Sequence, residues 1–197
     1  MPTVYYLRHG ETVWNATKRL QGRHDSALSA RGESQALRCA EILVDLFAKT
    51  GRQPDDLDYV SSPLGRACRT MQLVRGALRL APEDYRTDQR LAELSFGAWE
   101  GLTLEEVQAR DAALLAGREQ DKWGFLPPGG ESYAQVAERM GQWHAAVTRD
   151  TVVTAHGGTA RALFAHLGFA APERATQGDI DQGVVYVIAD GALARHG

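Results

Sequence analysis

The sequence has few cysteines, little net charge and no long apolar run, and each shortage excludes a class of protein. Its two cysteines, Cys39 and Cys68, lie in separate helix-like stretches without Cys-x-x-Cys spacing, so we expect buried thiols, with neither a disulfide nor a metal site. A formal net charge of −3 gives no strong electrostatic case for nucleic acid or a membrane as partner. No apolar run approaches the roughly 20 residues that a membrane-spanning helix needs.

The start of the sequence also lacks the pattern of a secretory signal. No basic segment precedes a long apolar stretch, and residues 4–7 already form a short apolar run. We therefore expect a cytoplasmic protein. The 197 residues are 44% hydrophobic and 24% charged, which is typical of a globular chain, and they contain no internal repeat. We expect a single domain over residues 1–197.

The sequence does contain short β-favouring runs that alternate with longer helical patterns. Strands are predicted over 4–7, 57–60 and 151–155, with a final hairpin over 184–195. Helices are predicted over 29–51, 62–78, 132–147 and 157–167. Ser62-Pro63 is predicted to start the second of these helices, because proline is tolerated at the first helical position.

This alternation predicts an α/β fold. Helices of ten or more residues between strands form βαβ crossovers, so we expect three layers, α/β/α, with a mainly parallel central sheet. Residues from about 87 to 131 are less regular, and Thr103 with Glu106 forms a capping box within them. We expect this segment to be a small helical and loop insertion that lies like a cap over the active site.

Two histidines directly follow predicted strands. His9, preceded by Arg8, comes after the strand at 4–7, and His156 comes after the strand at 151–155. In open α/β sheets, ligands bind outside the carboxyl ends of the strands. We therefore expect His9 and His156 to lie at the same edge of the sheet.

These residue types suit the transfer of a phosphoryl group. A neutral imidazole such as that of His9 can attack phosphorus, and a backbone carbonyl that accepts its other N–H would fix the tautomer. Arginine binds phosphate oxygens through its planar guanidinium, and Arg66 lies early in a predicted helix, where backbone amides favour anions. A carboxylic acid can protonate the leaving oxygen, and Glu93 in the irregular middle segment is the candidate.

Six stretches resemble the motifs of the histidine phosphatase superfamily, the phosphoglycerate-mutase-like proteins. They lie at 7–15, 19–32, 61–67, 93–101, 129–132 and 155–158. They follow the order of the family and span most of the chain. The resemblance implies a phosphohistidine on His9, with Arg8, Arg66 and His156 also catalytic and Glu93 as the proton donor.

The resemblance also implies a set of binding residues, with no metal and no cofactor. Those assigned to phosphate or substrate are Arg8, Thr12, Asn15, Gln21, Gly22, Arg66, His156 and Gly157. Other acidic residues compete with Glu93 for the role of acid. We expect Glu106 to cap a helix, Glu105 to be solvated and Glu100 to be a structural hydrogen-bond partner. Contact of His24 with substrate stays open.

The stretch 93–101 resembles the phosphatase branch of the family. We therefore predict a metal-independent phosphomonoesterase that acts on a small phosphorylated metabolite, with no nucleic acid and no membrane as partner. Two alternatives stay open: phosphoryl transfer between hydroxyls, as in phosphoglycerate mutases, and a phosphate-binding regulatory module with little turnover. The identity of the substrate, the role of the loop at 122–132 and the oligomeric state, a homodimer included, also stay open.

Overall fold

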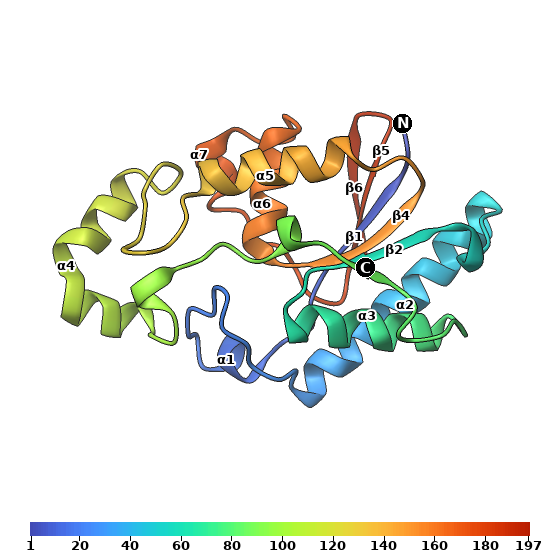
Figure 1. Cartoon of the computed structure of the whole chain (residues 1–197), viewed down its shortest axis with the longest axis horizontal. Helices are drawn as coiled ribbons and strands as arrows, with labels where there is room; N and C mark the ends of the chain where they lie inside the picture. Colours follow the sequence, from blue (N-terminus) through green and yellow to red (C-terminus); the bar gives the residue numbers. More distant parts are fainter.

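The computed structural model describes all 197 residues, and its centre is one six-stranded sheet (Figure 1). The strands are β1 (Val4–Arg8), β2 (Asp58–Ser61), β3 (Arg86–Thr87), β4 (Thr151–Ala155), β5 (Val185–Ala189) and β6 (Ala192–His196). Their order in the sheet is β3-β2-β4-β1-β5-β6. The first four run parallel, while β5 and β6 pair antiparallel.

Helices cover both faces of this sheet. They are α1 (Val13–Ala16), α2 (Ala30–Thr50), α3 (Gly65–Ala77), α4 (Leu104–Gln120), α5 (Tyr133–Ala145), α6 (Gly157–His166) and α7 (Pro172–Ala175). Side chains alternate along a strand, so Tyr5 and Leu7 of β1 pack with α2 and α3, whereas Val4 and Tyr6 pack with α5 and α6. The predicted three-layer α/β fold with a mainly parallel central sheet is confirmed.

Local sequence signals place most helix ends correctly. The Ser29 side chain accepts a hydrogen bond from the Gly32 N–H at the start of α2, and Gly51 ends that helix with a positive φ of 69°. The predicted capping box at Thr103 begins α4. A second box at Ser132 begins α5.

The start of α3 was predicted wrongly. The helix begins at Gly65, so Ser62-Pro63 lies before it. The Ser62 hydroxyl is engaged elsewhere, since it accepts the Leu64 N–H and lies 2.7 Å from His156 Nε2. The cap comes instead from Asp25, which is distant in the sequence and accepts the Gly65 N–H at 2.6 Å. The expectation for the thiols is also wrong in part, because Cys39 is buried but Cys68 is only half-buried.

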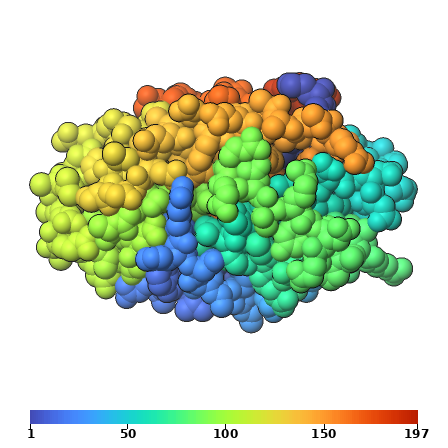
Figure 2. All heavy atoms as spheres, in the orientation of Figure 1, coloured from blue at the N-terminus to red at the C-terminus, as the bar shows by residue number.

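The segment that contains α4 has a small apolar cluster of its own. Trp99, Val107 and Leu115 form this cluster, and α4 lies at one end of the molecule, away from the sheet (Figure 1). The space-filling view shows the segment after α1 (blue) reaching the surface beside the α4 segment (Figure 2). Backbone bonds join them there, with Leu20 N–H donating to Leu102 C=O at 2.8 Å. A role of residues 87–131 as a cap stays a prediction.

Candidate active site

A polar pocket opens at the carboxyl ends of β1 and β4. Of the predicted site residues, those that line it are Arg8, His9, Asn15, Gln21, Gly22, Arg66, Glu93 and Gly157. His156 and Thr12 lie directly behind its wall, and neither is exposed. Glu93 is the single carboxylate among the lining residues, which include four arginines, so the pocket favours an anion.

His9 is held with one ring nitrogen free. It follows β1, its backbone N–H donates to Ala155 C=O at 2.9 Å, and its side chain is buried. Nδ1 lies 2.7 Å from the Gly10 carbonyl oxygen, which can only accept, so the proton is assigned to Nδ1 and the lone pair to Nε2. Burial, with the charges of Arg66 and Arg8, holds the pKa of His9 well below 6.5. The imidazole is therefore neutral and suited to nucleophilic attack.

His156 has the same tautomer as His9, but its protonated nitrogen is the one without a partner in the chain. Its Nε2 lies 2.7 Å from Ser62 Oγ, whose hydroxyl can donate to it, so we assign the ring proton to Nδ1. Nδ1 is buried without a partner in the chain. The rings of His156 and His9 are 5.1 Å apart between centroids. Burial is also the main cause that holds the pKa of His156 well below 6.5.

Arg8 and Arg66 each present a buried Nε toward this site. Arg8 Nη1 donates to the Ile180 carbonyl at 2.7 Å. Arg66 donates from Nη1 to the His24 carbonyl and from Nη2 to the Gly22 carbonyl, both at 2.7 Å. The Nε atoms of both arginines have no partner within the chain. With His156 Nδ1 they make three buried donors near His9, which is the arrangement an oxyanion or phosphoryl group requires.

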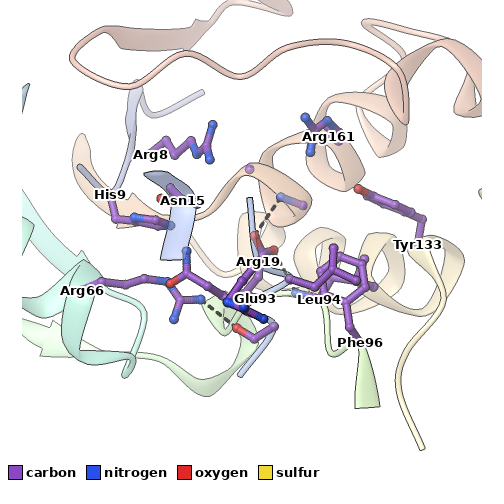
Figure 3. Close-up of a pocket in the computed structure, with 15 residues that line it drawn as sticks. Arg8, His9, Asn15, Arg19, Arg66, Glu93, Leu94, Phe96, Tyr133 and Arg161 are labelled. Carbon is purple, nitrogen blue, oxygen red and sulfur yellow. Dashed lines mark hydrogen bonds between the residues drawn. The ribbon is translucent and has the colours of Figure 1, made fainter. Parts of the chain in front are cut away.

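Glu93 lines the same pocket as Arg8 and Arg66 (Figure 3). Its carboxyl group accepts hydrogen bonds from the N–H groups of Gly158 at 3.1 Å and Thr159 at 3.2 Å, in the first turn of α6. A methyl group on Gly158 would lie 2.4 Å from Glu93 Oε1, so only glycine allows this approach. The α6 N-terminus thus fixes where the carboxyl group lies.

The competing glutamates are engaged outside the pocket. Glu100 accepts hydrogen bonds from Ser95 Oγ and from the Phe96 N–H, as a structural partner. Glu106 completes the capping box of α4, and Glu105 is exposed. The His24 side chain lies 3.6 Å from Glu100, and it does not line the pocket.

Thr12 holds the pocket wall instead of lining it. Its Oγ accepts from Gln21 Nε2 at 2.7 Å and from the Asn15 N–H at 3.1 Å. Asn15 Oδ1 accepts from the Thr12 N–H and from Gln182 Nε2, which leaves the Asn15 amide NH₂ free to donate into the pocket. Gln182 also donates to the His9 carbonyl at 3.1 Å.

Sequence reasoning missed several residues around the site. Arg19, Leu20, Leu94, Phe96, Tyr133 and Arg161 also line the pocket. Arg161 had a usable signal, since it lies four residues after Gly157 and therefore on the same face of a helix. Gln182 had none, because its partners are more than 160 residues away in the sequence. No three His, Cys, Asp or Glu side chains gather in a way that could hold a metal ion. No helix is long and apolar enough to cross a membrane.

Known proteins share both the sequence pattern and the fold. The family model described as the histidine phosphatase superfamily (branch 1) matches residues 4–190. The glucosyl-3-phosphoglycerate phosphatase of Mycolicibacterium vanbaalenii is 38% identical over 174 residues, which are 82% of this chain and 72% of that protein. A protein of Erwinia tasmaniensis described as a probable phosphoglycerate mutase, GpmB, is 36% identical over 146 residues, 72% of this chain.

The aligned part spans only 61% of the Erwinia protein, less than two thirds of its length. Among solved structures, the α-ribazole phosphatase of Shigella flexneri superimposes with a TM-score of 0.81 at 25% identity. That match covers 97% of this chain and 93% of the other. Nearly the whole chain therefore has the fold of this solved structure.

Proposed function

The chain belongs to the histidine phosphatase superfamily, and from this premise we propose that it is a phosphomonoesterase that hydrolyses a small phosphorylated metabolite through a phosphohistidine on His9. The family and the phosphatases among its relatives support an enzyme of phosphate-ester chemistry. The observation that carries the proposal is the free Nε2 of His9 beside three unpaired buried donors. We also propose a cytoplasmic location, in keeping with two free thiols.

The first step would transfer the phosphoryl group to the enzyme. His9 Nε2 attacks phosphorus, the P–N bond forms and the ester P–O bond breaks. Arg8 Nε, Arg66 Nε and His156 Nδ1 bind the non-bridging oxygens, whose charge they stabilise in the transition state. The leaving oxygen takes its proton from Glu93, which ends the step as a carboxylate.

The second step would release phosphate. Water attacks the phosphorus of the phosphohistidine, and the Glu93 carboxylate takes the proton of that water. The P–N bond breaks and its electron pair returns to His9 Nε2. The proton that Glu93 gives to the leaving oxygen in the first step is replaced by the one it takes from water in the second. No step requires a metal.

A trapping experiment tests the covalent step. Wild-type protein mixed with a ³²P-labelled aryl phosphate and quenched in alkali is expected to retain label that acid releases, as a phosphohistidine does. His9→Ala is expected to retain no label and to lose at least about 10³-fold in kcat, because nothing else in the pocket can replace the nucleophile. His196→Ala, in the terminal strand β6, serves as the control and should behave as wild type.

Normal turnover by His9→Ala would refute the mechanism. Phosphate binding by wild-type protein without hydrolysis between pH 5 and 8 would refute the phosphatase and favour a binding module. Interconversion of monophosphoglycerates in the presence of bisphosphoglycerate, faster than hydrolysis, would make the enzyme a mutase.

A further inference from the structure

Arg161 is a cation of the pocket that the proposed phosphoryl transfer does not use. It projects from α6 into the pocket, four residues after Gly157. Its Nε donates to the Gly178 carbonyl at 2.7 Å. Arg8 is held in the same manner by the Ile180 carbonyl, also at 2.7 Å. One short loop, 178–180, therefore orients two guanidinium groups.

The two guanidinium groups lie close to each other. A methyl group placed on Gly157 would lie 3.4 Å from Arg8 Nε and 3.5 Å from Arg161 Nη1. Figure 3 shows both side chains on the same side of the pocket. Both guanidinium groups therefore lie against the same glycine, and their positive charges repel. An anion bound between or beside them would offset this repulsion.

Arg161 has no counter-charge of its own within the chain. The other arginine near the pocket mouth, Arg19, pairs with Glu106 at 2.8 Å. Arg66 pairs with Asp25 at 3.1 Å. Arg161 pairs with no carboxylate. Its Nε donates to the Gly178 carbonyl, and its guanidinium also lies within hydrogen-bond reach of the Tyr133 hydroxyl, so both of these partners are neutral. Its outer nitrogens are therefore available to a ligand.

The surroundings of Arg161 add positive charge. Lys122 is half-buried nearby, and its pKa is lowered first by burial and then by the charges of Arg118 and Arg161. Glu119, an acidic residue whose charge acts on Lys122, is bonded to Arg118 at 2.7 Å. Tyr133 lines the same side of the pocket and supplies an aromatic wall (Figure 3). This positively charged region would attract an acidic group on the alcohol portion of the substrate, which is the leaving group.

We propose that Arg161 binds a second anionic group of the substrate, a carboxylate or a phosphate, next to the phosphoryl group that is transferred. This inference rests on the proposed function and names its substrate class: small phosphomonoesters with a second acidic group close to the ester. The planar guanidinium matches carboxylate and phosphate oxygens in pairs, and the three donors around His9 leave Arg161 to this task.

Three substrates with one carbon skeleton test the inference. At C1, glycerol 3-phosphate carries a neutral hydroxyl, 3-phosphoglycerate carries a carboxylate, and glycerol 1,3-bisphosphate carries a second phosphate. Wild-type kcat/KM is expected to favour at least one of the two acidic substrates over glycerol 3-phosphate by about 10- to 100-fold, the size of a charge-assisted hydrogen-bond pair. The substrate preferred identifies the acidic group.

Arg161→Gln is expected to lower kcat/KM for the preferred acidic substrate by the same factor and for glycerol 3-phosphate far less, so that the preference disappears. Arg161→Lys keeps the charge and should keep part of the preference. Arg174→Gln removes an exposed arginine of α7 and is the matched control. A preference that persists in Arg161→Gln, an equal loss for all three substrates, or no preference in wild-type protein would overturn the inference.

Binding to His9→Ala separates this inference from the proposed function. Calorimetric titration with the three compounds measures the preference without turnover, and His9→Ala/Arg161→Gln should lose it. If wild-type protein hydrolyses none of them but the binding preference follows Arg161, the proposed function fails and the inference stands. If wild-type protein hydrolyses all three equally well, the function stands and the inference fails.

Discussion

At the residue scale, the position of Glu93 depends on a neighbouring glycine, Gly158. Gly158 has no side chain, and Glu93 occupies the space that one would fill. The carboxyl group therefore reaches two N–H groups of the first turn of α6. The distance between Glu93 and the donors around His9 is set by this single glycine.

Two variants test Glu93 as a proton donor. Glu93→Gln is expected to lower kcat/KM, which reports formation of the phosphohistidine, about 10²- to 10⁴-fold for glycerol 3-phosphate and far less for p-nitrophenyl phosphate, whose leaving group needs no proton. Gly158→Ala should show the same pattern with a smaller loss, because the added methyl group displaces the flexible end of Glu93. Steady-state kcat/KM values with both substrates measure these losses, and Glu105→Gln serves as the exposed control. An equal loss of kcat/KM on both substrates would contradict Glu93 as the proton donor.

The sequence indicates these residues to different degrees. Arg8 and His9 are adjacent after a strand, and His156 follows another, so chain order alone brings them to one edge of the sheet. Gln182 was missed because its role depends on a loop near the carboxyl end, at 178–182, whose path no local pattern predicts. Arg161 was missed although its helical spacing from Gly157 was a usable signal. Thr12 is predicted to bind phosphate or substrate, but it lies buried behind the pocket wall, because its side chain caps α1.

At the element scale, helix α5 holds the segment that carries Glu93. Arg139 of α5 donates to the backbone carbonyls of Arg90 and Glu93. It also bonds the Glu131 carboxylate at 3.1 Å. The irregular segment around Glu93 has few backbone partners of its own, so this one side chain replaces a regular hydrogen-bond ladder.

Arg139→Ala is expected to destabilise the protein by about 2–3 kcal/mol, because it leaves two half-buried carbonyls and one carboxylate without their charged donor. It should also lower kcat, since Glu93 is then less firmly placed. Urea unfolding and steady-state kinetics measure the two effects. Glu138→Ala, an exposed neighbour on the same helix, should change neither. Full activity with a normal urea midpoint in Arg139→Ala would contradict this role of α5.

Helix ends also show where sequence patterns work and where they fail. The boundaries of α2, α4 and α5 follow from capping residues within three positions of the helix start. The start of α3 does not, because its cap is Asp25, forty residues earlier in the chain. A local rule cannot find a cap that only the fold provides.

At the scale of the whole molecule, two neutral histidines are buried at the centre of the fold. The pKa values of His9 and His156 lie well below 6.5 in the folded chain. An unfolded chain takes up protons on these residues as the pH falls through about 6.5, and the folded chain does not. Acidification therefore favours unfolding, and the stability that the neutral rings allow is fully present only above about pH 6.5.

The free energy of unfolding is expected to fall between pH 7.5 and pH 5 by up to about 1.4 kcal/mol per pH unit for each of these histidines. His144, whose pKa is lowered chiefly by burial, acts in the same direction. Denaturant unfolding at four pH values gives the slope. His156→Gln should flatten it, while His196→Gln should not. Equal slopes in wild-type protein and His156→Gln would show that the ring of His156 takes up a proton in the folded state.

The fold class follows from the alternation of strand and helix patterns, and the structure confirms it. The short edge strand β3 was not predicted, because two residues such as Arg86 and Thr87 have no periodicity. The hairpin of β5 and β6 was predicted from its turn at Asp190-Gly191. Its pairing beside β1 was not, because order within a sheet depends on contacts between distant segments.

The order of the strands in the sheet also determines when the candidate site can form during synthesis of the chain. Strand β1 precedes the other five strands in the chain but lies between β4 and β5, so it cannot complete its pairing until residues 151–155 and 185–189 have been synthesised. Arg8 and His9 likewise wait for the loop that supplies Ile180 and Gln182. The candidate nucleophile therefore has its surroundings only after the loop at 180–182 has been synthesised, and a chain released before this point carries His9 without its pocket.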